Sequence, residues 1–127
     1  MIYLDSSVAL AHLLAEDQRP PAEFWNNSLI ASRLVEYEVA TRLNNLGVTE
    51  AGREIADTLL HRIALIELIP EVVRRARDKY PLQLRTLDAL HLASVEFLRE
   101  QGVALEVATY DKRMRDAAVK LQIPLHW

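Results

Sequence analysis

The sequence predicts an α/β fold, a three-layer α/β/α domain with a central, mostly parallel sheet of about five strands. Short apolar, β-branched runs alternate with longer segments whose apolar residues recur at helical spacing, which is typical of βα units. The chain of 127 residues has three Gly and five Pro and contains no linker-like segment. Residues 1–127 are therefore expected to form one domain.

The strands are predicted from short apolar runs and the helices from apolar residues at intervals of three and four. The predicted strands are residues 1–4, 29–31, 66–69, 105–109 and 123–125. The last of them is expected at an edge of the sheet, because Pro124 lacks an N–H for the ladder. The predicted helices cover residues 8–14, 20–25, 34–43, 50–63, 71–79, 87–97 and 111–120.

Each helix start is predicted from a side chain that accepts a hydrogen bond from a free backbone N–H of the first turn. Ser, Thr and Asp are the preferred residues at this position. Gly102 is expected to end the helix at residues 87–97. The predicted caps are Ser6 or Ser7, Ser32, Thr49, Thr86 and Asp111.

Composition excludes several classes of protein. The absence of Cys excludes a disulfide scaffold, a Cys-ligated zinc site and a thiol nucleophile. The amino terminus lacks the pattern of a secretion signal, so a cytoplasmic location is expected. Uncharged stretches are far shorter than the roughly 20 residues of a membrane span, so no membrane partner is expected. A formal net charge of -3 argues against binding a polyanion through overall positive charge.

Four carboxylates are expected near the carboxyl ends of the strands, where parallel α/β sheets bind their ligands. Asp5 directly follows the first predicted strand, and Asp111 lies shortly after the fourth. Glu38 and Asp88 fall on otherwise apolar helix faces, where burying an unpaired charge costs several kcal/mol. Each acid taken alone also suits a position near a helix start, so it is their combination that indicates a site.

Acidic side chains that converge without Lys or Arg partners either take up protons or bind a cation. Ligands that are all oxygen suit Mg²⁺, with Mn²⁺ as a possible substitute. The sequence therefore predicts a metal site at Asp5, Glu38, Asp88 and Asp111.

Four motifs surround these acids: LDSS at residues 4–7, SRL at 32–34 followed by Glu38, TLDALHLA at 86–93 and TYD at 109–111. Together they resemble the PIN-domain ribonucleases, specifically the VapC toxins of bacterial VapBC toxin–antitoxin modules. The similarity spans the whole chain. It implies a PIN-like (Rossmann-like) fold in which Asp5, Glu38, Asp88 and Asp111 are the catalytic, metal-binding quartet.

The resemblance also implies an activity and partners. It implies an Mg²⁺-dependent endoribonuclease that inhibits translation and growth, with transfer RNA as the expected substrate and messenger or ribosomal RNA as alternatives. Its nucleophile would be a metal-activated water, because a divalent ion lowers the pKa of bound water and polarises a phosphoryl oxygen. The resemblance implies neutralisation by a cognate VapB antitoxin, contact with operator DNA only through that antitoxin, and a homodimer. The alternative is a catalytically silent PIN-like interaction module that acts through the antitoxin and operator DNA. Metal-dependent RNA cleavage distinguishes the two.

Several polar residues near the quartet have more than one interpretation. Ser6, Ser32 and Thr109 suit a hydrogen bond to water, carboxylate or phosphate as well as they suit helix capping. Asp116 is expected on a solvated helix face. His91 is expected to be packed or hydrogen-bonded rather than to ligate a metal.

Two further expectations concern neighbours of the quartet. Glu36 is not expected in the site, because residues two apart on a helix point about 200° away from each other. A basic stretch close behind Asp111 is expected to meet the phosphate backbone of a nucleic acid. Its residues are Lys112, Arg113 and Arg115.

Overall fold

The computed structural model describes residues 1–127, and its centre is a four-stranded sheet in which every pairing is parallel. The strand order is β3-β2-β1-β4, so the chain moves outward from β1 to β3 and then returns to the other side of β1. Strand order thus reverses between β1 and β4. The strands are β1 (Ile2–Leu4), β2 (Leu29–Ser32), β3 (Ala64–Ile66) and β4 (Glu106–Ala108).

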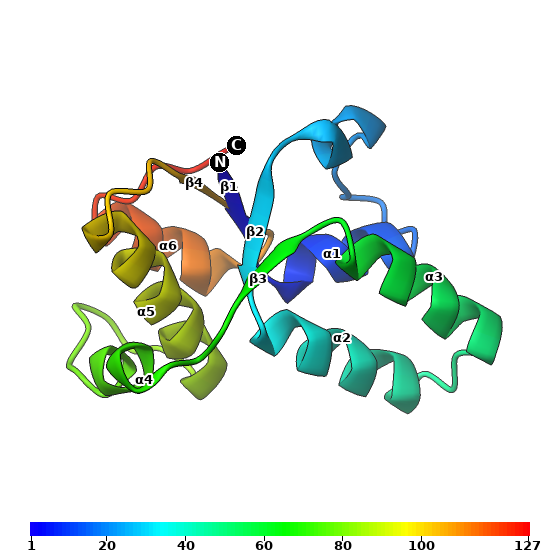
Figure 1. Cartoon of the computed structure of the whole chain (residues 1–127), viewed down its shortest axis with the longest axis horizontal. Coiled ribbons are helices and arrows are strands. Elements are labelled where there is room, and N and C mark those ends of the chain that lie inside the picture. Colours follow the sequence, from blue (N-terminus) through cyan, green and yellow to red (C-terminus); the bar gives the residue numbers. More distant parts are fainter.

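Helices cover both faces of the sheet, which confirms the predicted three-layer α/β/α architecture (Figure 1). One layer holds α1, α2 and α3, and the other holds α5 and α6, with α4 packed against α5. None of the helices is both long and apolar enough to cross a bilayer. The helices are α1 (Ser6–Leu13), the 3₁₀ helix η1 (Ala22–Asn26), α2 (Leu34–Asn45), α3 (Glu50–Leu60), α4 (Pro70–Ala76), α5 (Thr86–Glu100) and α6 (Lys112–Lys120).

The prediction of about five strands is wrong by one. Residues 123–125 contribute a single bridge, between Val107 and Leu125, and not a strand. Val107 donates to the carbonyl of Pro124 and accepts from His126, and Pro124 has no N–H with which to extend the ladder. The third strand ends at Ile66, earlier than predicted, because residues 67–69 lead directly into α4.

Successive side chains of β1 point to opposite faces of the sheet and so belong to two separate parts of the core. Ile2 and Leu4 point into the cluster formed with α1, α2 and α3, while Tyr3 points into the cluster formed with α5 and α6. All three side chains are buried. Because both faces of β1 are covered, this strand is apolar throughout, as a central parallel strand should be. Its carboxyl end is therefore a rigid support for the residue that follows, Asp5.

The predicted caps Thr49 and Asp111 are confirmed, and the predicted cap of α1 is wrong. Thr49 accepts from Gly52 N at 3.3 Å, and Asp111 caps α6 as predicted. The cap of α1 is Asp5 rather than Ser6 or Ser7, because its Oδ1 accepts from the N–H of Ser7 at 3.0 Å. The carboxylate at the end of β1 therefore also fixes the start of the next helix.

The starts of α2 and α5 differ in how they are capped. Ser32 Oγ accepts from Leu34 N at 3.2 Å, as a capping side chain does, although the cap position of α2 itself is Arg33, which is helical there. Thr86 does not cap α5, because it is already the first helical residue. The cap position belongs to Arg85, which is extended there (φ -76°, ψ 161°) and makes no capping hydrogen bond.

Candidate active site

A pocket of about 390 Å³ lies beyond the carboxyl ends of β1 and β4, at the point where strand order reverses. This is where open α/β sheets bind ligands. The four carboxylates predicted from the sequence all line it, although they come from four different parts of the fold. The lining residues are Asp5, Ser6, Ser7, Glu38, Arg85, Thr86, Leu87, Asp88, His91 and Asp111.

Asp5 is the most deeply buried of the four acids, with 4% of its surface exposed. Ser7 Oγ donates to its Oδ1 and Thr109 Oγ1 donates to its Oδ2, each at 2.5 Å. The second bond joins the residues that follow β1 and β4. Burial raises the pKa of Asp5, while the charge of His91 and the two hydroxyl donors counteract part of that rise. A hydrogen bond to each carboxylate oxygen therefore fixes the orientation of the Asp5 side chain.

Glu38 is held by two side chains from other helices. Ser6 Oγ donates to its Oε2 at 2.8 Å, and His91 Nε2 lies 2.5 Å from its Oε1. Because an ionised carboxylate only accepts, Nε2 carries the hydrogen of that bond. The other ring nitrogen of His91 lies 2.8 Å from the hydroxyl of Tyr3. A chain of hydrogen bonds therefore runs from Ser6 through Glu38 and His91 to the sheet.

The ring of His91 is 2% exposed and faces several acids. Burial alone would lower its pKa, but the hydrogen bond to Glu38 and the charges of Glu38, Asp5 and Asp88 outweigh burial and raise the pKa. The prediction of a hydrogen-bonded histidine is confirmed. The acids around the ring favour its protonated form over the neutral one.

Asp88 is the acid with an unsatisfied carboxylate oxygen. Its Oδ2 is buried and makes no hydrogen bond. Burial raises the pKa of Asp88, and the nearby charge of Asp111 raises it further, against smaller opposing effects of Arg85 and His91. A buried carboxylate oxygen without a hydrogen-bond donor lowers the stability of the fold unless a positive group lies next to it.

Asp111 faces the pocket from the start of α6. Its Oδ1 accepts from the backbone N–H groups of Arg113 at 2.8 Å and Met114 at 3.1 Å. Its own N–H is held by Thr109 Oγ1 at 3.0 Å. The cap therefore occupies Oδ1 and leaves Oδ2 for a ligand.

The donor set fits a hard divalent cation. Every available ligand atom in the pocket is a carboxylate or hydroxyl oxygen, the chemistry that Mg²⁺ and Mn²⁺ prefer, and the unpartnered Oδ2 of Asp88 needs a positive neighbour. The side chains line one pocket but no three of them converge closely enough to hold one ion in this arrangement. Their role as metal ligands stays a prediction.

The comparison with protein families decides the classification, since residues 2–120 match the PIN domain. The chain belongs to the PIN domain family. Ribonuclease VapC46 of Mycobacterium tuberculosis is 35% identical to it over 94% of this chain and 92% of the relative. Ribonuclease VapC35 of the same organism is 29% identical over 97% and 93%, and Ribonuclease VapC47 is 29% identical over 90% and 87%.

The structure of this PIN domain separates the residues whose interpretation was open. Ser6 and Thr109 both donate to a quartet carboxylate, whereas Ser32 acts as a helix cap and does not line the pocket. Asp116 is exposed, pairs with Lys112 at 2.8 Å and lies outside the pocket. Glu36 is also outside it, as predicted.

Two pocket residues of the PIN domain were missed by sequence reasoning. Ser7 was considered only as a cap, yet its hydroxyl donates to Asp5 and accepts from Tyr110 N at 2.9 Å. Arg85 is not among the residues predicted for the site. A cation directly before the helix that bears Asp88 is the sequence feature that indicates it. Of the predicted basic stretch, Lys112 is paired with Asp116, and Arg115 donates to the carbonyl of Trp127 at 2.8 Å.

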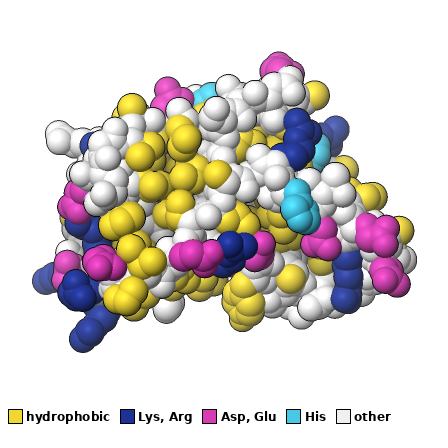
Figure 2. Space-filling model, in the orientation of Figure 1, with side chains coloured by type: hydrophobic (Ala, Val, Ile, Leu, Met, Phe, Trp, Pro, Cys, Tyr) yellow, Lys and Arg dark blue, Asp and Glu magenta, His cyan; other side chains and the backbone are white.

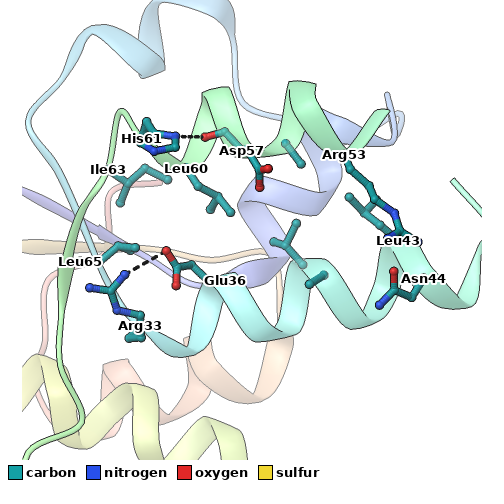
Figure 3. Close-up of a pocket in the computed structure, with 13 residues that line it drawn as sticks. Arg33, Glu36, Leu43, Asn44, Arg53, Asp57, Leu60, His61, Ile63 and Leu65 are labelled. Carbon is teal, nitrogen blue, oxygen red and sulfur yellow. Dashed lines mark hydrogen bonds and ion pairs between the residues drawn. The ribbon is translucent and has the colours of Figure 1, made fainter. Parts of the chain in front are cut away.

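A larger cavity of about 640 Å³ lies elsewhere, between α2 and α3 (Figure 3). Apolar side chains such as Leu43, Leu60 and Leu65 line it, and Arg33 with Glu36 stands at one end. The Arg33–Glu36 ion pair spans 2.9 Å. None of the quartet reaches this cavity, so we assign the chemistry to the smaller, acidic pocket.

Proposed function

We propose that this PIN domain is a ribonuclease toxin of a VapBC module, a metal-dependent endoribonuclease that inhibits translation and growth and is neutralised by a VapB antitoxin. The observation that supports it most is the gathering of Asp5, Glu38, Asp88 and Asp111 in one pocket at the switch point of the sheet. The names of the VapC relatives support the same conclusion.

In this proposal the quartet holds Mg²⁺, with Mn²⁺ as a substitute. When bound, the cation would lower the pKa of a water molecule and compensate the negative charge on the phosphoryl oxygens. The other pocket residues orient the acids: Ser7 and Thr109 hold Asp5, while Ser6 and His91 hold Glu38. Such hydrogen bonds fix the orientation of metal-binding side chains. Removing one typically lowers metal affinity or activity about 10- to 100-fold.

The proposed substrate is RNA, and transfer RNA is the class we favour from the VapC family. A pocket open at the end of the sheet admits a single strand and places its backbone beside the acids. Base recognition then depends on loops around the pocket, which read unpaired nucleotides more readily than a duplex.

The proposed partners are a VapB antitoxin and a second copy of the chain, with operator DNA contacted only through the antitoxin. The cavity between α2 and α3 suits the apolar face of an antitoxin helix, because its floor is apolar while Arg53, Asp57 and His61 at its border are polar (Figure 3). Helix-in-groove binding uses this kind of surface.

Cleavage of RNA by purified protein tests the activity. We expect cleavage that stops with EDTA and returns with Mg²⁺, and a loss of at least about 100-fold in Asp5→Ala and Asp88→Ala. Asp116→Ala is the matched control, because it removes an exposed acid outside the pocket. Circular dichroism must show that the variants are folded. Cleavage by Asp88→Ala at the wild-type rate contradicts the proposal, and RNA left intact by the wild type favours the silent interaction module.

Inhibition by VapB tests the partner separately. Ala40 is exposed and lines the cavity, so Ala40→Arg fills it with a long charged side chain. We expect this variant to cleave RNA normally and to resist inhibition. Ala51→Arg, on the exposed surface of α3 outside the cavity, is the control. Full inhibition of Ala40→Arg contradicts docking at this cavity.

A further inference from the structure

Arg85 is the only Lys or Arg among the residues that line the acidic pocket. It lies directly before α5, three residues ahead of Asp88, and its side chain is exposed. Its position is the one from which a Ser, Thr, Asp or Asn side chain would normally cap the helix, and Arg makes no such hydrogen bond there. Capping therefore does not explain an arginine at this place.

The guanidinium of Arg85 is also not used for internal pairing. Four carboxylates share its pocket, yet Arg85 takes part in none of the salt bridges of the structure. Of the other cations near the site, Lys112 pairs with Asp116 and Arg115 donates to the carbonyl of Trp127, while the exposed Arg113 does not line the pocket. Arg85 thus presents an unengaged cation at the mouth of the pocket.

A pocket lined by four acids repels a polyanionic strand, and the rest of the surface does little to compensate. The formal net charge is -3. On the face drawn in Figure 2, Lys and Arg side chains form small separate groups among acidic ones instead of a broad basic field. Attraction for a phosphate must then come from a local cation. Guanidinium matches phosphate geometry with two parallel hydrogen bonds, which ammonium does not.

We propose that Arg85 binds a phosphate of the RNA backbone at the mouth of the acidic pocket and so positions the strand over the carboxylates. This inference rests on the proposed ribonuclease function and adds to it a substrate-binding residue. A contact to phosphate carries no base preference, so Arg85 contributes affinity and register for every RNA sequence. The competing role is internal, with Arg85 serving only to offset the charge of Asp88.

The experiment measures RNA binding without cleavage. A single-stranded RNA oligonucleotide is titrated against full-length protein in the Glu38→Gln background, at several salt concentrations. Arg85→Gln is compared with Arg85→Lys and with Lys120→Gln. Lys120 is the matched control, because it is an exposed cation at the opposite end of α6 from the pocket.

We expect Arg85→Gln to weaken RNA binding about tenfold, the equivalent of one charged hydrogen-bonded contact. The slope of log affinity against log salt should fall by about 0.7, the value for one phosphate of a single strand. Arg85→Lys should restore the salt slope but only part of the affinity, since an ammonium lacks the paired donors. Lys120→Gln should bind as the background does. In the otherwise wild-type enzyme, Arg85→Gln should raise KM more than it lowers kcat.

Unchanged affinity and salt slope in Arg85→Gln overturn the proposal. So does a loss of Mg²⁺ affinity or thermal stability with an unchanged salt slope, which is the pattern of a residue that only offsets Asp88. These results leave the ribonuclease function intact if the wild type cleaves RNA with Mg²⁺. A wild type that neither binds nor cleaves RNA overturns both proposals at once.

Discussion

His91 and Glu38 are joined by a hydrogen bond of 2.5 Å between Nε2 and Oε1, although 53 residues separate them in the sequence. The bond connects α5 to α2 at the carboxyl end of the sheet. It fixes the direction of a carboxylate that otherwise sits on a half-exposed helix face.

Replacing His91 should weaken the site through Glu38. We expect His91→Ala to raise the Mg²⁺ concentration needed for half-maximal cleavage about 10- to 100-fold, the range for groups that orient metal ligands. His91→Gln, which keeps a donor, should lower that Mg²⁺ requirement part of the way back toward the wild-type value. His61→Ala is the control, because His61 is exposed at the end of α3, does not line the acidic pocket and bonds only to the carbonyl of Asp57. An unchanged Mg²⁺ requirement in His91→Ala contradicts the orienting role.

Replacing Tyr3 tests the inner end of the same chain. Tyr3→Phe removes the hydroxyl that lies 2.8 Å from His91 Nδ1 and leaves a buried polar atom without a partner. The free energy of unfolding should fall by about 1–3 kcal/mol. Urea denaturation measures it. Tyr37→Phe, at a side chain that is 62% exposed, should change little. Equal stability of Tyr3→Phe and the wild type would show that the hydroxyl contributes nothing.

Thr109 should matter to both stability and metal binding. Thr109→Val keeps the shape of the side chain and removes the donor to Asp5 Oδ2, at a position with 0% exposure. We expect a loss of about 1–3 kcal/mol in stability and a weaker affinity for Mg²⁺. Isothermal titration with the metal alone measures the second effect. Thr58→Val removes an exposed hydroxyl from α3 and is the control. Wild-type values in Thr109→Val contradict this interpretation of the bond.

The unpartnered charge of Asp88 should make the metal-free protein less stable as the pH rises. The pKa of Asp88 is raised in the folded state above its ordinary value of 3.8, so between the two values the folded protein binds more protons than the unfolded chain. Stability therefore falls as the pH rises through this window, and the loss persists above it. Asp88→Asn has no such charge to bury. In EDTA, the difference in stability between Asp88→Asn and the wild type should therefore shift in favour of the variant as the pH rises. The midpoints of urea denaturation at each pH measure this difference.

The control for that series is Asp116→Asn, at an exposed residue paired only with Lys112. Its stability relative to the wild type should stay nearly constant, because surface pairs contribute little. A constant difference between Asp88→Asn and the wild type across the series would contradict an uncompensated charge at Asp88.

The sequence was sufficient to predict the layers and the position of the quartet, because each acid lies beside a local signal. Asp5 and Asp111 follow apolar strands, and Asp88 lies in the first turn of a helix. Because the carboxyl ends of parallel strands meet at one edge of the sheet, these acids are expected close together. Local signals could not give the partners of those acids. The pairing of His91 with Glu38 depends on how α2 and α5 meet, which only the packed core decides.

Errors in the sequence prediction lie where two local signals compete. Thr86 is a better cap than Arg85 by residue preference, yet the helix begins at Thr86 and leaves Arg85 at the cap position. Pro124 lies in an apolar run that predicts a strand, but its missing N–H limits the pairing to one bridge. At Arg85 the start of the helix does not follow residue preference, and at Pro124 the missing N–H outweighs the apolar pattern.

The hydrogen bond between Thr109 and Asp5 joins residues 104 positions apart and bears on protein synthesis. β1 is synthesised long before its neighbour β4 and the acid that follows β4. The acidic pocket therefore cannot form on a nascent chain until both segments have left the ribosome, because its two sides lie 104 residues apart in the sequence.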